Sequence, residues 1–319
     1  MTVESTNPVA VPDPMTAVLR DAGYLVRRIA EVSDCAAEDV VRRLAMEQAS
    51  LGTNVAMAVK QWDLQPYVWS DRLLEFYRTT DAFLYETIVW NRTSQKNEMR
   101  RWIATFLARR FAHGARVLTF GDGLGFDSQY LATAGHEVDY YDVSDDAGAF
   151  ARTLFADFHN SVRILSGADE VVADAYDVCV CLDVLEHIPE PAGVVESLAR
   201  AIRPGGYLIV HAPFWYLSRA VATHLRENRK YSGDVKRLYQ PFGLRPVDGN
   251  VFWNPLVLQK QGQSSQQSNV ALPYRVRLGG WLLAWARYWA VPHVLVLRWM
   301  LARGRTPWQE LEALRAEYE

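Results

Sequence analysis

A strand, a glycine-rich turn and a helix follow one another in "ARVLTFGDGLGFDSQYLATAGH", residues 115–136. Val117 to Phe120 is a short apolar run of the kind that forms a buried strand. Gly121, Gly123 and Gly125 then precede a helical pattern that ends near Gly135. Glycine lets a ligand approach the main chain, although a tight turn without a ligand has the same pattern. The segment predicts the opening βαβ unit of a nucleotide-binding sheet.

Further apolar runs alternate with helical stretches after this unit, and the connections are long enough for crossover helices. The predicted strands are Arg116–Phe120, Glu137–Tyr141, Val162–Leu165, Asp177–Leu182 and Gly206–His211, with a final pair near Leu244–Pro246 and Asn250–Leu258. We therefore predict an α/β fold: a Rossmann-like, mostly parallel seven-stranded sheet with helices on both faces and helical additions at each end. Ligands bind such sheets at the carboxyl ends of the strands.

The pattern of residues divides the chain into four predicted parts. We expect a disordered lead-in without a signal peptide at 1–14, a helical lid or substrate region at 15–112, the nucleotide-binding domain at 113–262, and a C-terminal helical segment at 270–319. The predicted lid is rich in aromatic residues, which either line an apolar pocket or pack the helices together. They are Trp62, Tyr67, Trp69, Phe76, Tyr77, Phe83, Tyr85 and Trp90.

Charge and cysteine content limit the classes of partner and compartment. The formal net charge of −3 gives no electrostatic case for nucleic acid, so we expect a small-molecule substrate and no nucleic-acid partner. Three cysteines without a pairing pattern suit a reducing cytoplasm. Their spacing fits neither a zinc site nor a redox pair, and we expect no metal.

Acidic side chains follow three of the predicted strands. Asp142 lies about 20 residues beyond the glycines, where an acid can accept both hydroxyls of a ribose, although it can also cap the next helix. Asp169, in the loop after the third strand, either reaches an adenine or is an exposed acid. Asp183 follows the fourth strand, and Glu186 and His187 after it are either catalytic or a cap and packing pair.

Four motifs stand in order: "VLTFGDGLG", "YYDVS", "YDVCVCLDVLEHIPEP" and "RPGGYLIVHAP". Together, over about Arg116 to Ala212, they resemble the class I S-adenosylmethionine-dependent methyltransferases, in the branch that modifies small molecules. The resemblance implies S-adenosylmethionine as the cofactor. By position, its residues would be Gly121, Asp122, Gly123, Gly125, Asp142, Val143, Ala168, Asp169, Leu182 and Asp183. The family's usual acid two residues before the first glycine is Thr119 here, so Asp122 is expected to contact the methionine ammonium instead.

Methyl transfer to a hydroxyl or an acidic carbon needs a base, and the candidates are His187, His211, His224 and Tyr231. In "THLRENRKYSG", His224 is expected to share a helical face with Asn228. The predicted function is methylation of a small apolar or aromatic secondary metabolite. A non-catalytic S-adenosylmethionine-binding protein remains the main alternative, and an NAD-dependent oxidoreductase is a weaker one.

The segment 279–305, "GGWLLAWARYWAVPHVLVLRWMLARGR", is apolar but interrupted by charges and a proline. A membrane-spanning helix needs about 20 nearly uncharged residues, so this segment is not expected to span a bilayer. Peripheral contact with a membrane is an alternative that we do not favour. We expect a homodimer interface or a closed helical cap.

Overall fold

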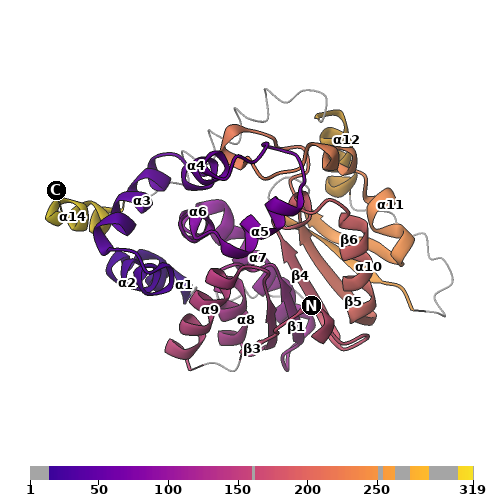
Figure 1. The fold of residues 1–319 in the computed structure, drawn as a ribbon. Coiled ribbons are helices and arrows are strands. Elements are labelled where there is room, and N and C mark those ends of the chain that lie inside the picture. The colour runs from indigo at the N-terminus through magenta and orange to yellow at the C-terminus, as the bar shows by residue number, and fades with distance from the viewer. Residues whose placement is uncertain (1–13, 160–161, 251–253, 263–273, 287–307, 319) are drawn as a thin grey trace.

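The computed structural model describes residues 14–159, 162–250, 254–262, 274–286 and 308–318. Its centre is a seven-stranded sheet with the spatial order β3-β2-β1-β4-β5-β7-β6 (Figure 1). The strands are β1 Arg116–Phe120, β2 Glu137–Tyr141, β3 Val162–Ile164, β4 Tyr176–Leu182, β5 Ile202–His211, β6 Leu244–Asn250 and β7 Asn254–Lys260. β7 pairs antiparallel with both β5 and β6, and the pairs from β3 to β5 are parallel. The predicted fold class is confirmed.

Helices cover both faces of the sheet (Figure 1). The α-helices are α1 Met15–Arg20, α2 Ala22–Ser33, α3 Ala37–Ala49, α4 Thr53–Gln61, α5 Asp71–Thr79, α6 Ala82–Asn91, α7 Ser94–Arg110, α8 Phe126–Thr133, α9 Asp145–Asp157, α10 Pro191–Ala201, α11 Val235–Leu238, α12 Tyr274–Ala286 and α14 Gln309–Tyr318. Short 3₁₀ helices are η1 Ala168–Glu170, η2 Leu185–His187, η3 Arg219–Val221, η4 Arg226–Tyr231 and η5 Gln240–Phe242.

Alternation along the strands divides the core into two parts, because successive side chains point to opposite faces. Val117, Val178 and Val180 pack with α7, α8 and α9, whereas Leu118 packs with α10 and α11 on the other face. Cys179 and Cys181, two residues apart on β4, both belong to this second cluster. Burial raises the pKa of both thiols, which therefore stay protonated at neutral pH.

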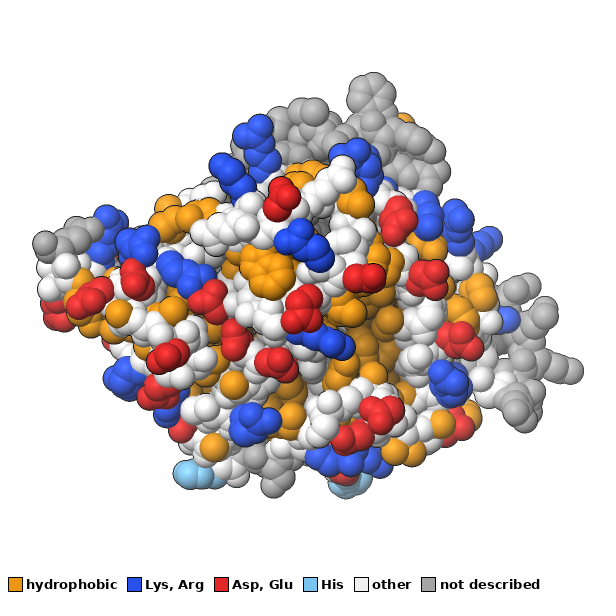
Figure 2. Space-filling model, viewed as in Figure 1, with side chains coloured by type: hydrophobic (Ala, Val, Ile, Leu, Met, Phe, Trp, Pro, Cys, Tyr) orange, Lys and Arg blue, Asp and Glu red, His pale blue; other side chains and the backbone are white. Residues whose placement is uncertain are grey.

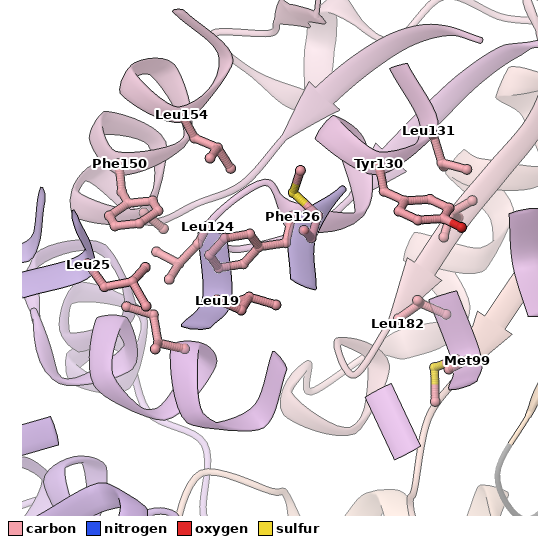
Figure 3. Close-up of a cluster of buried hydrophobic side chains, with 14 of the residues drawn as sticks. Leu19, Leu25, Met99, Leu124, Phe126, Tyr130, Leu131, Phe150, Leu154 and Leu182 are labelled. Atoms are coloured by element: carbon pink, nitrogen blue, oxygen red, sulfur yellow. The ribbon is translucent and has the colours of Figure 1, made fainter. Parts of the chain in front are cut away.

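The first helices of the chain are part of the main core. Leu19 and Leu25 point towards Phe126 and Phe150, which come from α8 and α9 (Figure 3). α14 packs against α2 and α3, so residues from the two ends of the chain meet (Figure 1). There the backbone N–H of Ala22 donates to Glu310, 3.0 Å away. This arrangement holds the N-terminal helices over the edge of the sheet where β1 and β4 end.

Two local expectations differ from the structure. The fifth strand, predicted from Gly206, begins at Ile202 and contains an irregularity: Tyr176 pairs with Ile202, and Val178 then pairs with Tyr207. A left-handed glycine, Gly205, with φ of +83°, accommodates the extra residues without ending the strand. His224 lies before η4 instead of sharing a helix face with Asn228.

The described part of the C-terminal segment has an exposed aromatic stripe on α12. Tyr274, Leu278, Trp281 and Trp285 are separated by four, three and four residues and are 72%, 39%, 64% and 54% exposed. Residues 287–307, which complete the predicted Trp- and Arg-rich segment, lie outside the described residues. Within the described ranges, no helix has the length and apolarity needed to span a bilayer.

Candidate functional site

Two adjoining chambers lie at the carboxyl ends of β1 and β4. The outer chamber, of about 480 Å³, also lies beside the end of β2 and is lined on its other side by α5 and α6. The inner chamber, of about 100 Å³, is lined by residues of α6 and α7. Both are lined by Thr87, Phe120, Gly121, Gly123 and Asp183. Hydrophobic side chains gather in a hollow near the middle of the face shown in Figure 2, with charged side chains around it.

Charged groups of both signs line the inner chamber. Lys96 is only 5% exposed and donates to Asp127 over 2.8 Å, and Arg100 donates to the other oxygen of Asp127 over 2.9 Å. Burial alone would raise the pKa of Asp127, but the two cations outweigh it and hold the pKa below its ordinary value. Buried charges are stable only when they are paired. This network therefore fixes the positions of Lys96 and Asp127 in the wall of the inner chamber.

Asp183 is at the junction of the two chambers. Its carboxylate accepts from Trp90 Nε1 over 3.1 Å and contacts His211 Nδ1 at 2.5 Å. Burial opposes ionisation, but His211 and Lys96 lower the pKa of Asp183, so it is ionised at neutral pH. Its φ of +59° is unusual for a residue other than glycine. Strained backbone conformations of this kind are common at functional sites. Here the conformation places the carboxylate at the junction of the two chambers.

The glycine turn has positive φ at all three glycines, but they serve different purposes. A Cβ at Gly121 would lie 2.4 Å from Val184 Cγ2, and one at Gly125 would lie 2.6 Å from Phe155. Those two glycines permit close packing within the protein. Gly123 meets no atom closer than 3.4 Å, and its surface faces both chambers. Of the three glycines, Gly123 is therefore the one at which a ligand can approach the main chain most closely.

Asp142 lines the outer chamber at the end of β2. It accepts from the backbone N–H groups of Gly123, over 2.7 Å, and Ser144, over 2.9 Å. The cap of the next helix is Ser144, whose hydroxyl accepts from Ala147 N–H, so Asp142 is not that cap. Each carboxylate oxygen keeps a second acceptor position, which is what contact with a ribose hydroxyl requires.

Asp122 has a different environment from the one expected. Its two oxygens accept from the backbone N–H groups of Asp127 and Ser128, the first free donors of α8. A side chain of the protein therefore already accepts from two of the free N–H groups at this helix N-terminus. Burial and the neighbouring Asp127 raise the pKa of Asp122 to about 7. Asp122 still lines the inner chamber.

The remaining cofactor candidates divide between the chambers and the surface. Leu182 lines the inner chamber, and Val143, 39% exposed, lines the outer one. Ala168 and Asp169 are exposed in η1 and are not among the residues that line either chamber. Contact between these two residues and an adenine stays a prediction.

Two candidate bases, His187 and His224, lie together around Glu186. The two imidazole rings are 4.7 Å apart between centroids, in an edge-to-face arrangement. Burial lowers the pKa of His187 to about 4 and that of His224 to about 3, so both rings are neutral at pH 7. His187 lines the outer chamber, and His224 does not. The chain after β5 is held against this loop by Asn228, whose amide donates to the carbonyl oxygens of Glu186 and Ile188.

The other two candidate bases are placed differently. His211, at the end of β5, pairs with Asp183 and does not line either chamber. Tyr231 packs against Phe214 and near the cations of Lys230 and Arg237, away from both chambers. Of the four candidates, His187 alone is a wall residue of the outer chamber.

The aromatic residues of the predicted lid have two roles. Trp69, Tyr77 and Phe83 line the outer chamber, and Trp90 lines the inner one. Tyr77 and Phe83 stack with centroids 5.2 Å apart, and the Tyr77 hydroxyl meets His187 Nδ1 at 2.9 Å. The others pack within the protein: Trp62 and Phe76 join a separate apolar cluster, and Tyr85 is buried beneath Arg43.

Sequence reasoning missed several residues that line the inner chamber: Thr87, Asn91, Lys96 and Asp127. The first three precede the first strand, in helices whose pattern shows only an apolar face. Lysine is rarely buried, and nothing local distinguishes Lys96 from a lysine on a solvated face.

Known proteins that are similar to this chain are methyltransferases. A family model described as a methyltransferase domain matches residues 91–245. A ubiquinone biosynthesis O-methyltransferase of Burkholderia vietnamiensis is 34% identical over 116 residues, which are 35% of this chain and 48% of the relative. One of Thiobacillus denitrificans is 35% identical over 112 residues, 34% of this chain and 47% of the relative. The chain thus spans less than half the length of these curated relatives.

Similarity to solved structures is weak. Magnesium protoporphyrin IX methyltransferase from Synechocystis PCC 6803, solved with bound S-adenosylmethionine, is 17% identical, with a TM-score of 0.44 over 60% of this chain and 97% of that one. The assignment therefore rests on the family model and the sequence relatives. Residues 91–245 include the glycine turn, Asp142, Asp183 and Lys96. Residues 91–245 thus match the methyltransferase-domain family, and the chain is similar to O-methyltransferases over about a third of its length.

Proposed function

We propose that the protein is an S-adenosylmethionine-dependent methyltransferase that acts on a hydroxyl group of a small apolar or aromatic secondary metabolite. The observation that carries this proposal is the pair of joined chambers. The inner one has charges of both signs, and the outer one is mostly apolar with an acid, Asp142, on its wall. The hydroxyl acceptor is supported by the O-methyltransferase names of the relatives.

The chambers fit the chemical parts of the cofactor. A methionine carries an ammonium and a carboxylate, which Asp183 and Lys96 would bind in the inner chamber. A ribose would hydrogen-bond to Asp142, and an adenine needs apolar walls such as Phe120 and Tyr141. When bound, S-adenosylmethionine supplies an electrophilic methyl group. The protein's own residues orient the acceptor and exclude water, which is most of what an in-line displacement requires.

The acceptor would lie between the aromatic side chains of α5 and α6 and the loop after β4. Trp69, Tyr77 and Phe83 offer flat apolar surfaces there, and His187, in contact with Tyr77, borders the same pocket. Pockets of this kind, apolar with few polar groups, bind aromatic small molecules.

The test is calorimetric titration of the full chain with S-adenosylmethionine and its demethylated product. Both ligands should bind, and Asp142→Ala should weaken binding on the order of 100-fold, because it removes two charge-assisted hydrogen bonds. Asp145→Asn, an exposed acid in the first turn of α9, is the matched control and should change little. Binding of NAD but of neither ligand would favour the oxidoreductase. Binding without formation of the demethylated product, across phenols and other hydroxyl compounds, would favour the non-catalytic alternative.

We also propose a homodimer in the cytoplasm. Support for the dimer is the stripe on α12, since four large exposed apolar side chains on one helix face favour an interface. Support for the cytoplasm is that Cys35, Cys179 and Cys181 are all free thiols. Trp281→Glu should convert a dimer to a monomer in sedimentation experiments. A monomeric wild type that binds lipid vesicles would favour the membrane-surface alternative.

A further inference from the structure

Glu186 is a buried carboxylate for which the structure shows no hydrogen-bond donor. Its residue is 1% exposed, and neither Oε1 nor Oε2 has a hydrogen-bond partner among the residues that the structure describes. Burial and the nearby charge of Asp183 raise its pKa well above the ordinary value. An unpaired buried carboxyl group costs free energy, so its retention here needs a physical reason.

Two imidazole nitrogens face this carboxylate. Nε2 of His187 lies 4.0 Å from Oε1, and Nε2 of His224 lies 3.9 Å from the same atom. One ligand atom from each of the three residues lies within 4.8 Å of the other two. These distances are too long for hydrogen bonds, and they surround a common point.

A carbonyl oxygen on the opposite side of each ring favours the tautomer with the proton on Nδ1. Nδ1 of His224 lies 2.8 Å from the carbonyl oxygen of Tyr216, to which only a protonated Nδ1 can donate. Nδ1 of His187 lies 3.3 Å from the carbonyl oxygen of Thr223 and 2.9 Å from the Tyr77 hydroxyl. With the proton on Nδ1, Nε2 of both rings presents a lone pair towards Glu186. Histidine ligands of metals are oriented by hydrogen bonds of this kind.

We propose that Glu186, His187 and His224 form a binding site for a divalent transition-metal ion of the zinc class. Three groups that converge without hydrogen bonding to one another can all be satisfied by one cation, and two imidazoles with one carboxylate are a ligand set that Zn²⁺ favours. Ligand atoms about 2.0–2.1 Å from a tetrahedral metal are about 3.3 Å apart, so the three side chains would move together by roughly half an ångström. The site stands independently of methyl transfer.

The three proposed ligands come from two segments that are far apart in the sequence, so no local motif indicates a metal site. Glu186 and His187 come from η2, after β4, whereas His224 comes from the chain after β5. The backbone bond from Leu225 N–H to the Glu186 carbonyl, 2.9 Å long, joins the two segments. Because His187 also lines the outer chamber, a bound ion would lie beside the proposed acceptor pocket.

The experiment is titration of the chelator-treated full chain with Zn²⁺ and, for its visible absorption, Co²⁺. We expect one ion per chain, a rise in Tm with Zn²⁺, and a Co²⁺ spectrum that reports nitrogen and oxygen ligands. Glu186→Gln and His224→Gln should each weaken binding on the order of 100-fold or more, since even loss of an outer-shell partner costs 10–100-fold. Tyr77→Phe, which removes only the hydroxyl beside His187, should weaken it about tenfold.

His136→Gln is the matched control, because His136 is a buried histidine outside the cluster whose Nδ1 accepts from Ala115 N–H. It should bind both metals as the wild type does. The proposal is overturned if the wild type binds neither ion, or if Zn²⁺ leaves its Tm unchanged. It is also overturned if Glu186→Gln binds as tightly as the wild type. The wild-type titration alone decides the matter if a variant does not fold.

Discussion

The two chambers share a wall but are built differently. The inner one is fixed by buried ion pairs and hydrogen bonds, with Lys96, Asp127 and Asp183 each held by at least one partner. The outer one is lined mostly by aromatic and aliphatic side chains, several of them only half-buried, and α5 and α6 supply part of this lining. A site that must place charged groups accurately needs rigid walls, whereas an apolar acceptor pocket can vary in shape. Changes in the inner wall should therefore affect stability, and changes in the outer wall should spare it.

The largest effect is expected from Asp127→Asn. The substitution leaves Lys96 and Arg100 buried beside a neutral amide, so the free energy of unfolding should fall by about 3–5 kcal/mol in denaturant titrations. Asp39→Asn breaks an exposed pair with Arg42 and should cost less than about 1 kcal/mol. Equal losses for the two variants would show that the inner wall is no more rigid than the surface.

Gly121→Ala is expected to have the next largest effect, about 2–4 kcal/mol. The new Cβ would lie 2.4 Å from Val184 Cγ2, and φ of +74° is itself unfavourable for alanine. Gly135→Ala is the control, because φ there is +91° but no atom lies within 4 Å, so only the backbone cost of about 1–2 kcal/mol remains. The double variant Gly121→Ala/Val184→Ala should recover the steric part. Absence of any recovery would contradict the packing described for this turn.

The smallest effect is expected in the outer wall, from Leu74→Ala. Leu74 is half-buried and borders a cavity, so its truncation should cost about 1 kcal/mol or less. Its neighbour Leu73 is 4% exposed, and Leu73→Ala should cost about 2–5 kcal/mol. Thermal and denaturant unfolding of the two variants measures the contrast directly. If Leu74→Ala were as costly as Leu73→Ala, the outer wall would be as rigid as the core.

The parts of the site that the sequence predicted are those carried by contiguous segments. The turn at Gly123 and the acid Asp142 follow single strands, and a parallel sheet brings the ends of its strands to one edge. Alternation of side chains along a strand is likewise a local property, which is why the strands were placed almost correctly.

Other parts depend on contacts between distant segments. Lys96 reaches Asp127 from α7, and His224 reaches Glu186 from the chain after β5. Which segments meet depends on how the helices pack against one another. The local periodicity of hydrophobic residues does not contain this information. The hydrogen bonds of Asp122 to its own helix were not predicted for a related reason: they depend on a few backbone angles of the turn.

The attachment of α14 also affects how the chain is synthesised. Glu310, which accepts from Ala22 N–H, can do so only after it has left the ribosome, and it follows Ala22 by 288 residues. At about 5–20 residues per second, roughly 15–60 s separate the two. During that interval α2 and α3 lack the apolar surface of Leu311 and Trp308, which later covers them. The N-terminal helices are thus made well before the segment that covers them, so a nascent chain offers chaperones an exposed apolar surface there.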